Sequence, residues 1–334
     1  MACLIGILAW KDSTLATYDK EGRQDARLYS ILQDRGVPKD NILYLQDDEG
    51  TLDNCIQAVE ETAKKGSSDS LFFFYYAGHG IKDRNTSKAY FLNYDCNTST
   101  PESTCLSLDS IAGIVADQFK GKKVILTADC CYSGNLNKVA DTLEKAGKET
   151  CVFSSATSSN FSTGQWTFTM CLNDALAGEP AAKPGGGNIT VADIASYIYI
   201  NMKYADFQMS NFYTTDQFSQ DFIMSSVADS VSLSSDTHVG EYKEAPYNNK
   251  WYRVRIIEQK GEKVKITYLG YGTDWDEWVS YTSLEDISFS VYSKKDKIKV
   301  EWDGEWFPAT IVEVKDVFHY INSVSYTHLR AHET

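Results

Sequence analysis

The stretch Val124-Ile-Leu-Thr-Ala-Asp-Cys-Cys-Tyr-Ser-Gly134 begins as a continuous apolar run and ends in small residues with two thiols. An apolar run of this length that leads into turn residues predicts a strand buried on both faces of a sheet. A second run of the same kind, Leu71-Phe-Phe-Phe-Tyr-Tyr-Ala-Gly-His-Gly80, ends in a histidine between two glycines. The sequence thus places a cysteine and a histidine at the ends of two buried strands.

The segments around these two runs alternate between strand and helix patterns. We expect strands at residues 2–9, 41–45, 70–76, 89–94, 123–128 and 151–155, and a late strand at 221–225. We expect helices at residues 22–35, 51–65, 107–119, 167–177 and 190–202, another helix that follows the 123–128 strand and ends at about Ala146, and a polar loop at 81–88. This order predicts an α/β domain over residues 1–225, with a mostly parallel sheet flanked by helices.

Composition restricts the classes of partner. The net charge of −14 disfavours binding to nucleic acid or to an anionic membrane and favours a basic partner. No apolar run approaches the roughly 20 residues that cross a bilayer, and the N-terminus lacks the basic region of a signal peptide. The eight cysteines show no zinc-binding spacing. Because the sequence shows no secretion signal, we expect reduced thiols in a cytoplasmic or nuclear protein.

The pattern changes after residue 225. Residues 226–239 are rich in Ser, Asp and Val and predict a linker, and residues 240–290 form short alternating strands typical of a small antiparallel barrel. The pattern starts again over 291–322 as a partial second copy, in which the strands matching Lys263–Tyr281 are missing after Tyr320. The last residues, 323–334, fit neither unit, and we interpret them as a non-native tail.

His79 and Cys131 are the candidate reactive pair, 131 − 79 = 52 positions apart. A caspase histidine lies about 50 residues before its cysteine. Both side chains follow parallel strands, whose carboxyl ends form the ligand-binding rim of such sheets. An imidazole generates the thiolate that attacks a carbonyl, and the amides of Gly80 and Cys131 are candidates for the oxyanion hole. We expect Cys131 to be the nucleophile and Cys130 to pack inward.

The strings Tyr-Tyr-Ala-Gly-His-Gly (75–80) and Asp-Cys-Cys-Tyr-Ser-Gly (129–134) resemble the caspase-like clan, and its metacaspase and paracaspase branch most closely. The resemblance extends over about residues 2–225 and implies a cysteine endopeptidase with His79 as base and Cys131 as nucleophile. Metacaspases cut after Arg or Lys and carry acids at the positions of Asp25 and Asp129. The resemblance therefore implies an acidic S1 pocket made by these two residues, and peptide substrates with a basic P1 residue.

Some positions depart from the metacaspase pattern. Tyr132 stands where metacaspases usually have His, and Gln24-Asp25 replaces Asn-Asp. Asp95 matches one ligand of the acidic cluster that binds calcium in some metacaspases, and the other ligand positions have no evident counterpart. The sequence therefore does not contain the full set of calcium ligands found in those metacaspases, and we expect no cofactor.

Tyr268-Leu-Gly-Tyr-Gly-Thr-Asp-Trp-Asp-Glu-Trp-Val279 resembles a Tudor-knot or chromo-barrel domain. In members that bind methyl-lysine, an aromatic cage surrounds the cation. The matching positions are Tyr252, Tyr268, Tyr271 and Trp275, so the resemblance implies methylated or basic protein tails as partners. The same aromatics also suit a plain barrel core. A second hypothesis is therefore a catalytically inactive adaptor, with the α/β domain as scaffold and the barrel as the reader of such tails.

Overall fold

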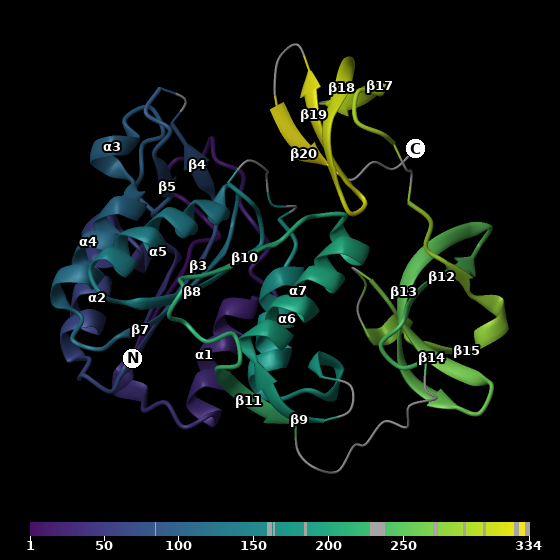
Figure 1. Ribbon diagram of the computed structural model, residues 1–334, viewed down its shortest axis with the longest axis horizontal. Helices are drawn as coiled ribbons and strands as arrows, with labels where there is room; N and C mark the ends of the chain where they lie inside the picture. Colours follow the sequence, from purple (N-terminus) through teal and green to yellow (C-terminus); the bar gives the residue numbers. More distant parts are fainter. Residues whose placement is uncertain are drawn as a thin grey trace.

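The computed structural model describes residues 1–83, 85–158, 162, 164–183, 186–227, 238–269, 271, 273–289, 292–302, 305–323 and 327–330. Its central sheet has six strands in the order β10-β8-β7-β3-β1-β2 (Figure 1). Five of them run parallel: β1 Ala2–Gly6, β2 Ile42–Gln46, β3 Leu71–Ala77, β7 Lys123–Asp129 and β8 Glu149–Ser154. The edge strand β10 Asn211–Thr214 is antiparallel to β8. The predicted mostly parallel α/β sheet is confirmed.

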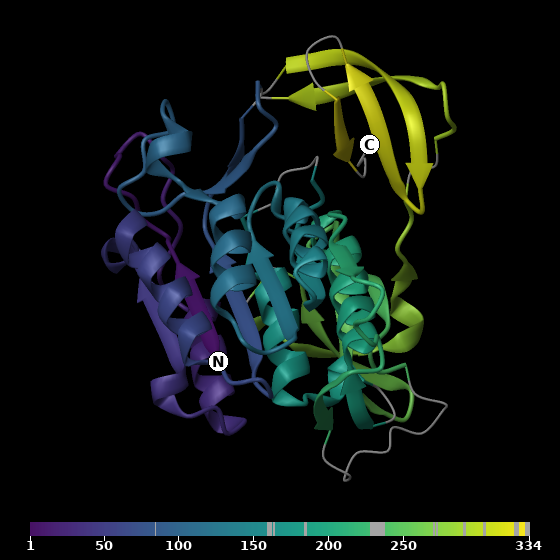
Figure 2. The same cartoon turned by 60° about the vertical axis from the view of Figure 1, so that its left-hand side comes forward.

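Helices cover both faces of this sheet (Figure 2). One core joins it to α2 Leu52–Lys65, α4 Leu108–Gln118 and α5 Leu136–Lys145, and the other to α1 Gln24–Asp34, α6 Thr167–Ala177 and α7 Val191–Asp206. Strand β3 supplies both cores because successive side chains of a strand point to opposite faces. Phe72 and Phe74 lie in the first core, and Phe73 and Tyr75 in the second. Each such buried side chain contributes about 1.5–3 kcal/mol.

Short elements surround the carboxyl end of β3. β4 Gly80–Lys82, β5 Ala89–Phe91 and β6 Leu106–Ser107 form a three-stranded sheet, with α3 Pro101–Thr104 before β6. The polar loop expected at 81–88 therefore begins as a strand. The late strand expected at 221–225 is β11 Ile223–Val227, which pairs with β9 Gly187–Thr190 outside the central sheet. The central sheet instead ends in the four-residue β10, whose Phe212 and Tyr213 pack against the two cores and which alternation did not reveal.

Two antiparallel sheets follow. The first has the order β15-β14-β13-β12-β16, and its end strands β15 and β16 are not paired with each other in the described part of the chain. Its strands are β12 Tyr242–Tyr247, β13 Lys250–Lys260, β14 Lys263–Tyr268, β15 Glu277–Ser280 and β16 Glu285–Asp286. The second sheet contains β17 Lys297–Trp302, β18 Glu305–Lys315, β19 Phe318–Ser323 and β20 Thr327–Arg330. Residues 228–237 of the predicted linker, and 324–326 and 331–334 of the predicted tail, lie outside the described residues.

The internal repeat is regular at the level of strands. β17, β18 and β19 begin and end 55 positions after β12, β13 and β14, as 305 − 250 shows for β18. The pairing irregularity between Ile256 and Glu258 recurs between Ile311 and Glu313. The strand that matches β14 is therefore present as β19, which corrects the expectation that the repeat stops after Tyr320.

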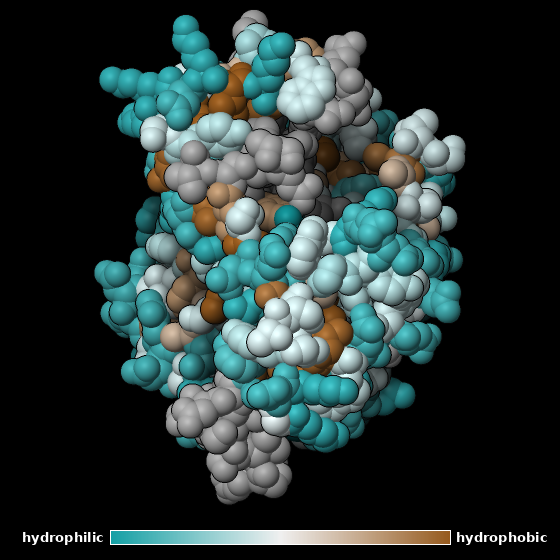
Figure 3. All heavy atoms as spheres, turned by 90° about the vertical axis from the view of Figure 1, so that its right-hand side faces the viewer, coloured by the Kyte–Doolittle hydropathy of each residue, from teal (hydrophilic) through white to brown (hydrophobic). Residues whose placement is uncertain are grey.

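Helix α7 contacts both C-terminal sheets. Arg255 of β13 donates to the Tyr197 hydroxyl at 2.8 Å, and Lys203 pairs with Asp316 of the β18–β19 turn at 2.7 Å. Figure 3 shows a face of the molecule that is largely hydrophilic, with small separated hydrophobic patches. No helix within the described residues combines the length and apolarity that crossing a bilayer requires.

Candidate functional site

The ends of β3 and β7 lie side by side, because Ala77 is in register with Asp129 and Gly78 N–H donates to the Asp129 carbonyl at 3.3 Å. A side chain at Gly80 would place its Cβ 2.2 Å from the Cys131 carbonyl oxygen, so only glycine permits this approach. Gly78 has φ 148°, which also favours glycine. The two glycines around His79 thus bring its loop against the cysteine turn.

The two thiols have different surroundings. Cys130 is 1% exposed, and burial raises its pKa well above the ordinary range. Cys131 is partly exposed, and its Sγ accepts a hydrogen bond from the Ser162 amide at 3.3 Å. Burial also raises the pKa of Cys131, so its resting form is the neutral thiol. Cys131 is the more accessible of the two thiols.

The Cys131 turn has an uncommon backbone conformation. Tyr132 has φ 58° and ψ 15°, in the left-handed region, and the chain then enters a short 3-10 helix at Ser133–Asn135. Non-glycine residues in this region cost free energy and often occur at functional sites. The turn directs the chain from β7 into α5 and leaves Cys131 at the strand end.

His79 is held on three sides. Its Nε2 lies 2.7 Å from the Ala16 carbonyl oxygen, and its Nδ1 lies 2.9 Å from the Tyr18 hydroxyl. The ring stacks on Trp10 with centroids 4.3 Å apart. Burial lowers the pKa of His79, and the Ala16 hydrogen bond opposes this shift in part. The imidazole is therefore neutral at physiological pH, as a general base requires.

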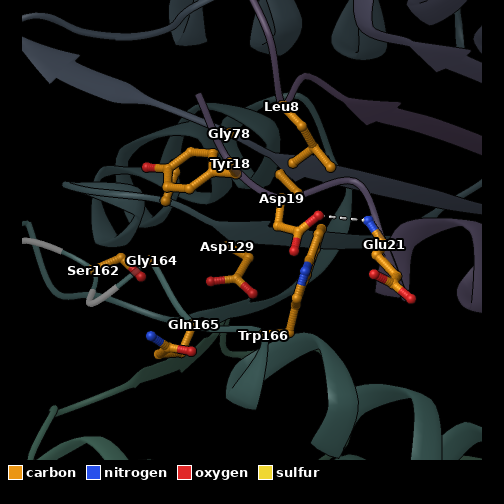
Figure 4. Close-up of a pocket in the computed structure, with 12 residues that line it drawn as sticks. Leu8, Tyr18, Asp19, Glu21, Gly78, Asp129, Ser162, Gly164, Gln165 and Trp166 are labelled. Atoms are coloured by element: carbon orange, nitrogen blue, oxygen red, sulfur yellow. Dashed lines mark hydrogen bonds between the residues drawn. The ribbon is translucent and has the colours of Figure 1, made fainter. Parts of the chain in front are cut away.

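A cavity of about 330 Å³, shown in Figure 4, is lined in part by Gly78 and Cys130, which directly precede His79 and Cys131 in the sequence. Three acids line it: Asp129, and also Asp19 and Glu21 from the segment that follows Tyr18. The Asp129 carboxylate accepts a hydrogen bond from Thr169 Oγ1 at 2.7 Å, and burial raises its pKa to about 6. The cavity has an acidic lining suited to a cation.

Asp25 is not among the residues that line this cavity. Arg23 binds it through two hydrogen bonds, Nε to Oδ1 at 2.8 Å and Nη2 to Oδ2 at 2.6 Å. Arg23 also binds Asp47 at 3.0 Å and the Gly6 carbonyl oxygen at 2.9 Å. Burial raises the pKa of Tyr75, and the charges of Asp129 and Asp25 raise it further, so both carboxylates lie near this residue. The carboxylate of Asp25 already has an internal guanidinium partner.

Sequence reasoning missed Tyr18, Asp19, Glu21 and Arg23. No periodicity marks them, because they lie in the irregular segment between β1 and α1. Asp95, the candidate calcium ligand, instead accepts hydrogen bonds from Leu52 N and Asn93 Nδ2. Among the described residues, no group of three His, Cys, Asp or Glu side chains could hold a metal ion.

The four aromatic residues predicted as a cage lie together, with a fifth ring from Tyr247. Tyr252 meets Tyr268 and Tyr271 edge to face, with centroids 6.0 and 5.9 Å apart. Tyr271 and Trp275 are 5.7 Å apart, and Tyr247 lies 5.8 Å from Trp275. Tyr268 is buried and donates to Glu277 at 2.7 Å, whereas the other four rings are wholly or partly exposed. Tyr247 was missed because it stands at the end of β12, outside the recognised string.

Comparison with known proteins identifies part of this chain. Residues 23–140 match the family model described as Metacaspase, peptidase C14 domain. No curated protein matches the chain. The crystal structure of protein GSU0716 from Geobacter sulfurreducens is similar over 68% of this chain and 99% of its own, with 16% identity and a TM-score of 0.47. Residues 23–140, which include His79 and Cys131, are a metacaspase peptidase C14 domain, and this domain implies a cysteine peptidase.

Proposed function

We propose that this protein is a cysteine endopeptidase in which Cys131 is the nucleophile and His79 the base. The observation that carries the proposal is the accessible Cys131 thiol at the end of β7, beside the His79 loop at the end of β3. Cys131 Sγ attacks the scissile carbonyl while His79 Nδ1 takes its proton. His79 then protonates the leaving amine, and water hydrolyses the thioester. The amides of Gly80 and Cys131 stabilise the oxyanion.

The proposed P1 residue is Arg or Lys. An anionic cavity favours a cationic side chain by charge complementarity. Asp129, Asp19 and Glu21 line the cavity, so these three acids are the proposed contacts of the P1 cation. Asp25 has a smaller role in this proposal than the resemblance implied, because Arg23 already neutralises its carboxylate.

The test is a P1 profile of the full chain on peptides with Arg, Lys, Asp or Ala at P1. Cys131→Ala should abolish cleavage, whereas the matched control Cys130→Ala should retain it. Asp129→Asn should lower kcat/KM for Arg peptides by at least tenfold, as loss of a buried charge contact predicts. Cleavage that survives Cys131→Ala, or a preference for Asp at P1, would rule out the proposal.

The five rings of the first C-terminal sheet support a second candidate function, recognition of methylated lysine in protein tails. A quaternary ammonium among aromatic faces gains cation–π attraction without the desolvation cost of a primary ammonium. Exposed rings at Tyr247, Tyr271 and Trp275 leave the group open to solvent. A tail bound there would be delivered to the peptidase as substrate. In the alternative adaptor hypothesis, the same tail binds a chain that does not cut it.

A peptide array with unmodified and trimethylated lysine tests this role. The full chain with Cys131→Ala should bind methylated peptides without cleaving them, and Tyr271→Ala should abolish the preference. Equal binding to both forms would remove the methyl-lysine role. If the wild-type chain, which retains Cys131, binds these peptides and cleaves none of them, the result would favour the adaptor hypothesis.

A further inference from the structure

The Ala16 carbonyl determines which nitrogen of His79 is the base. A carbonyl oxygen can only accept, so the 2.7 Å contact requires the proton of neutral His79 to be on Nε2. Nδ1 then carries the lone pair. The tautomer is thus fixed by the backbone of the segment between β1 and α1.

The Tyr18 hydroxyl donates a hydrogen bond to the lone pair of Nδ1. It lies 2.9 Å from Nδ1 and must donate, because unprotonated Nδ1 has no hydrogen to give. Stacking on Trp10 keeps the imidazole in this orientation. A nitrogen that accepts the phenol proton cannot at the same time accept the proton of a thiol.

Tyr18 also lies close to the nucleophile. Burial raises the pKa of the Tyr18 phenol above its ordinary range, and a negative charge at Cys131, Cys130 or Asp129 would raise it further. The phenol therefore stays protonated and remains a donor throughout the physiological range. Tyr18 also lines the cavity, together with Cys130 and Asp129. Figure 4 shows Tyr18 and Asp129 there.

We propose that Tyr18 is a gate on the base: in the resting protein its hydroxyl holds His79 Nδ1, and cleavage begins only after this hydroxyl leaves. The inference rests on the proposed peptidase function. A Cys–His peptidase needs the base nitrogen free to take the thiol proton, and this structure assigns that nitrogen to Tyr18.

The segment that carries Tyr18 is suited to moving on substrate binding. Between Leu15 and Glu21 it forms no helix or strand, and its contacts are few: Tyr18 N donates to Leu8 O at 2.9 Å, Ala16 O and the Tyr18 hydroxyl meet His79, and Leu15 and Tyr18 pack against the core. The Lys20–Asp47 ion pair at 2.9 Å, half-exposed on the lysine side, adds little. Asp19 and Glu21 follow Tyr18 in sequence and line the cavity. A basic side chain in the cavity would attract these acids and displace the adjacent phenol.

Tyr18→Phe removes the hydroxyl and retains the ring. The readout is the alkylation rate of Cys131 by iodoacetamide in the full chain, followed by mass spectrometry with fragmentation that separates Cys131 from Cys130. We expect about a fivefold rise, the factor that corresponds to one net hydrogen bond. Tyr213→Phe is the matched control, since its hydroxyl binds Asp141 and neither residue lines the cavity, and it should change nothing.

A combined variant tests whether the effect passes through the imidazole. With His79→Ala, Tyr18→Phe should no longer raise the alkylation rate. A rate unchanged or lowered by Tyr18→Phe overturns the gate, and so does a rise of the same size without His79. Alkylation does not need a peptide substrate, so failure of every peptide to be cleaved would count against the peptidase function and leave the gate supported by the alkylation rates.

Discussion

Replacing Arg23 by glutamine should destabilise the α/β part of the protein by about 3 kcal/mol. Arg23 is 11% exposed and Asp25 is fully buried, and two hydrogen bonds join them. Removing one partner of a buried ion pair costs about 3–5 kcal/mol, because the remaining charge is desolvated without compensation. We expect the lower end of this range, since Asp25 keeps the hydrogen bond from the Ala26 amide at 3.0 Å.

The assay is urea unfolding of the full chain, followed by the helical circular dichroism signal. This signal reports the α/β part, because the described residues from 238 onward contain no α-helix. The double variant Arg23→Gln/Asp25→Asn should recover most of the loss, since the uncompensated charge is gone. Arg27→Gln is the matched control: its pair with Asp174 is 42% exposed on the arginine side, and exposed pairs contribute at most about 1 kcal/mol.

A cost for Arg23→Gln no larger than that for Arg27→Gln would refute this reasoning. It would mean that Arg23 is loosely held, and that a substrate cation can readily reach the Asp25 carboxylate. A double variant no more stable than Arg23→Gln would also contradict it, because the loss would then come from packing instead of charge.

Three further predictions concern the two candidate sites. Asp129→Asn should stabilise the protein by about 3 kcal/mol at neutral pH, because the pKa of this carboxyl is near 3.8 in the unfolded chain and about 6 in the folded one. The wild-type protein therefore loses stability as pH rises from 3.8 to 6, and urea unfolding below pH 3.8 should give equal stabilities for the wild type and the variant. Gly80→Ala should reduce kcat/KM by at least tenfold with little change in KM, because its Cβ would lie 2.2 Å from the Cys131 carbonyl oxygen; unchanged kinetics would show that this loop is pliable. Trp275→Ala should weaken binding of a trimethyl-lysine peptide about tenfold by calorimetry, whereas Trp306→Ala, an exposed ring on the second sheet, should leave it unchanged.

Most strands and helices of the α/β part could be predicted from the sequence, because their apolar periodicity is strong. Helix α2, for example, begins after Thr51, whose side chain accepts from Asn54 N as an N-cap, and ends at Gly66. Strand β10 could not be predicted, since its four residues are too few to show a periodicity. The pairing of β11 with β9 is a long-range choice that local patterns do not encode.

The sequence by itself determined the order of the buried strands and the positions of His79 and Cys131 at their ends. It also determined the pattern of aromatic residues in the C-terminal repeat. These features are local: alternation, glycine placement and turn residues act within a few positions of the chain.

Only the tertiary structure decided which groups those residues meet. The resemblance assigns Asp25 and Asp129 to one pocket, yet Arg23 binds the first and the second lines a cavity. His79 is oriented by Ala16 and Tyr18, from an irregular segment 61 or more positions away. Burial, hydrogen-bond partners and charge neighbours depend on how distant segments pack, and these determine whether a carboxylate is neutralised or a base is free.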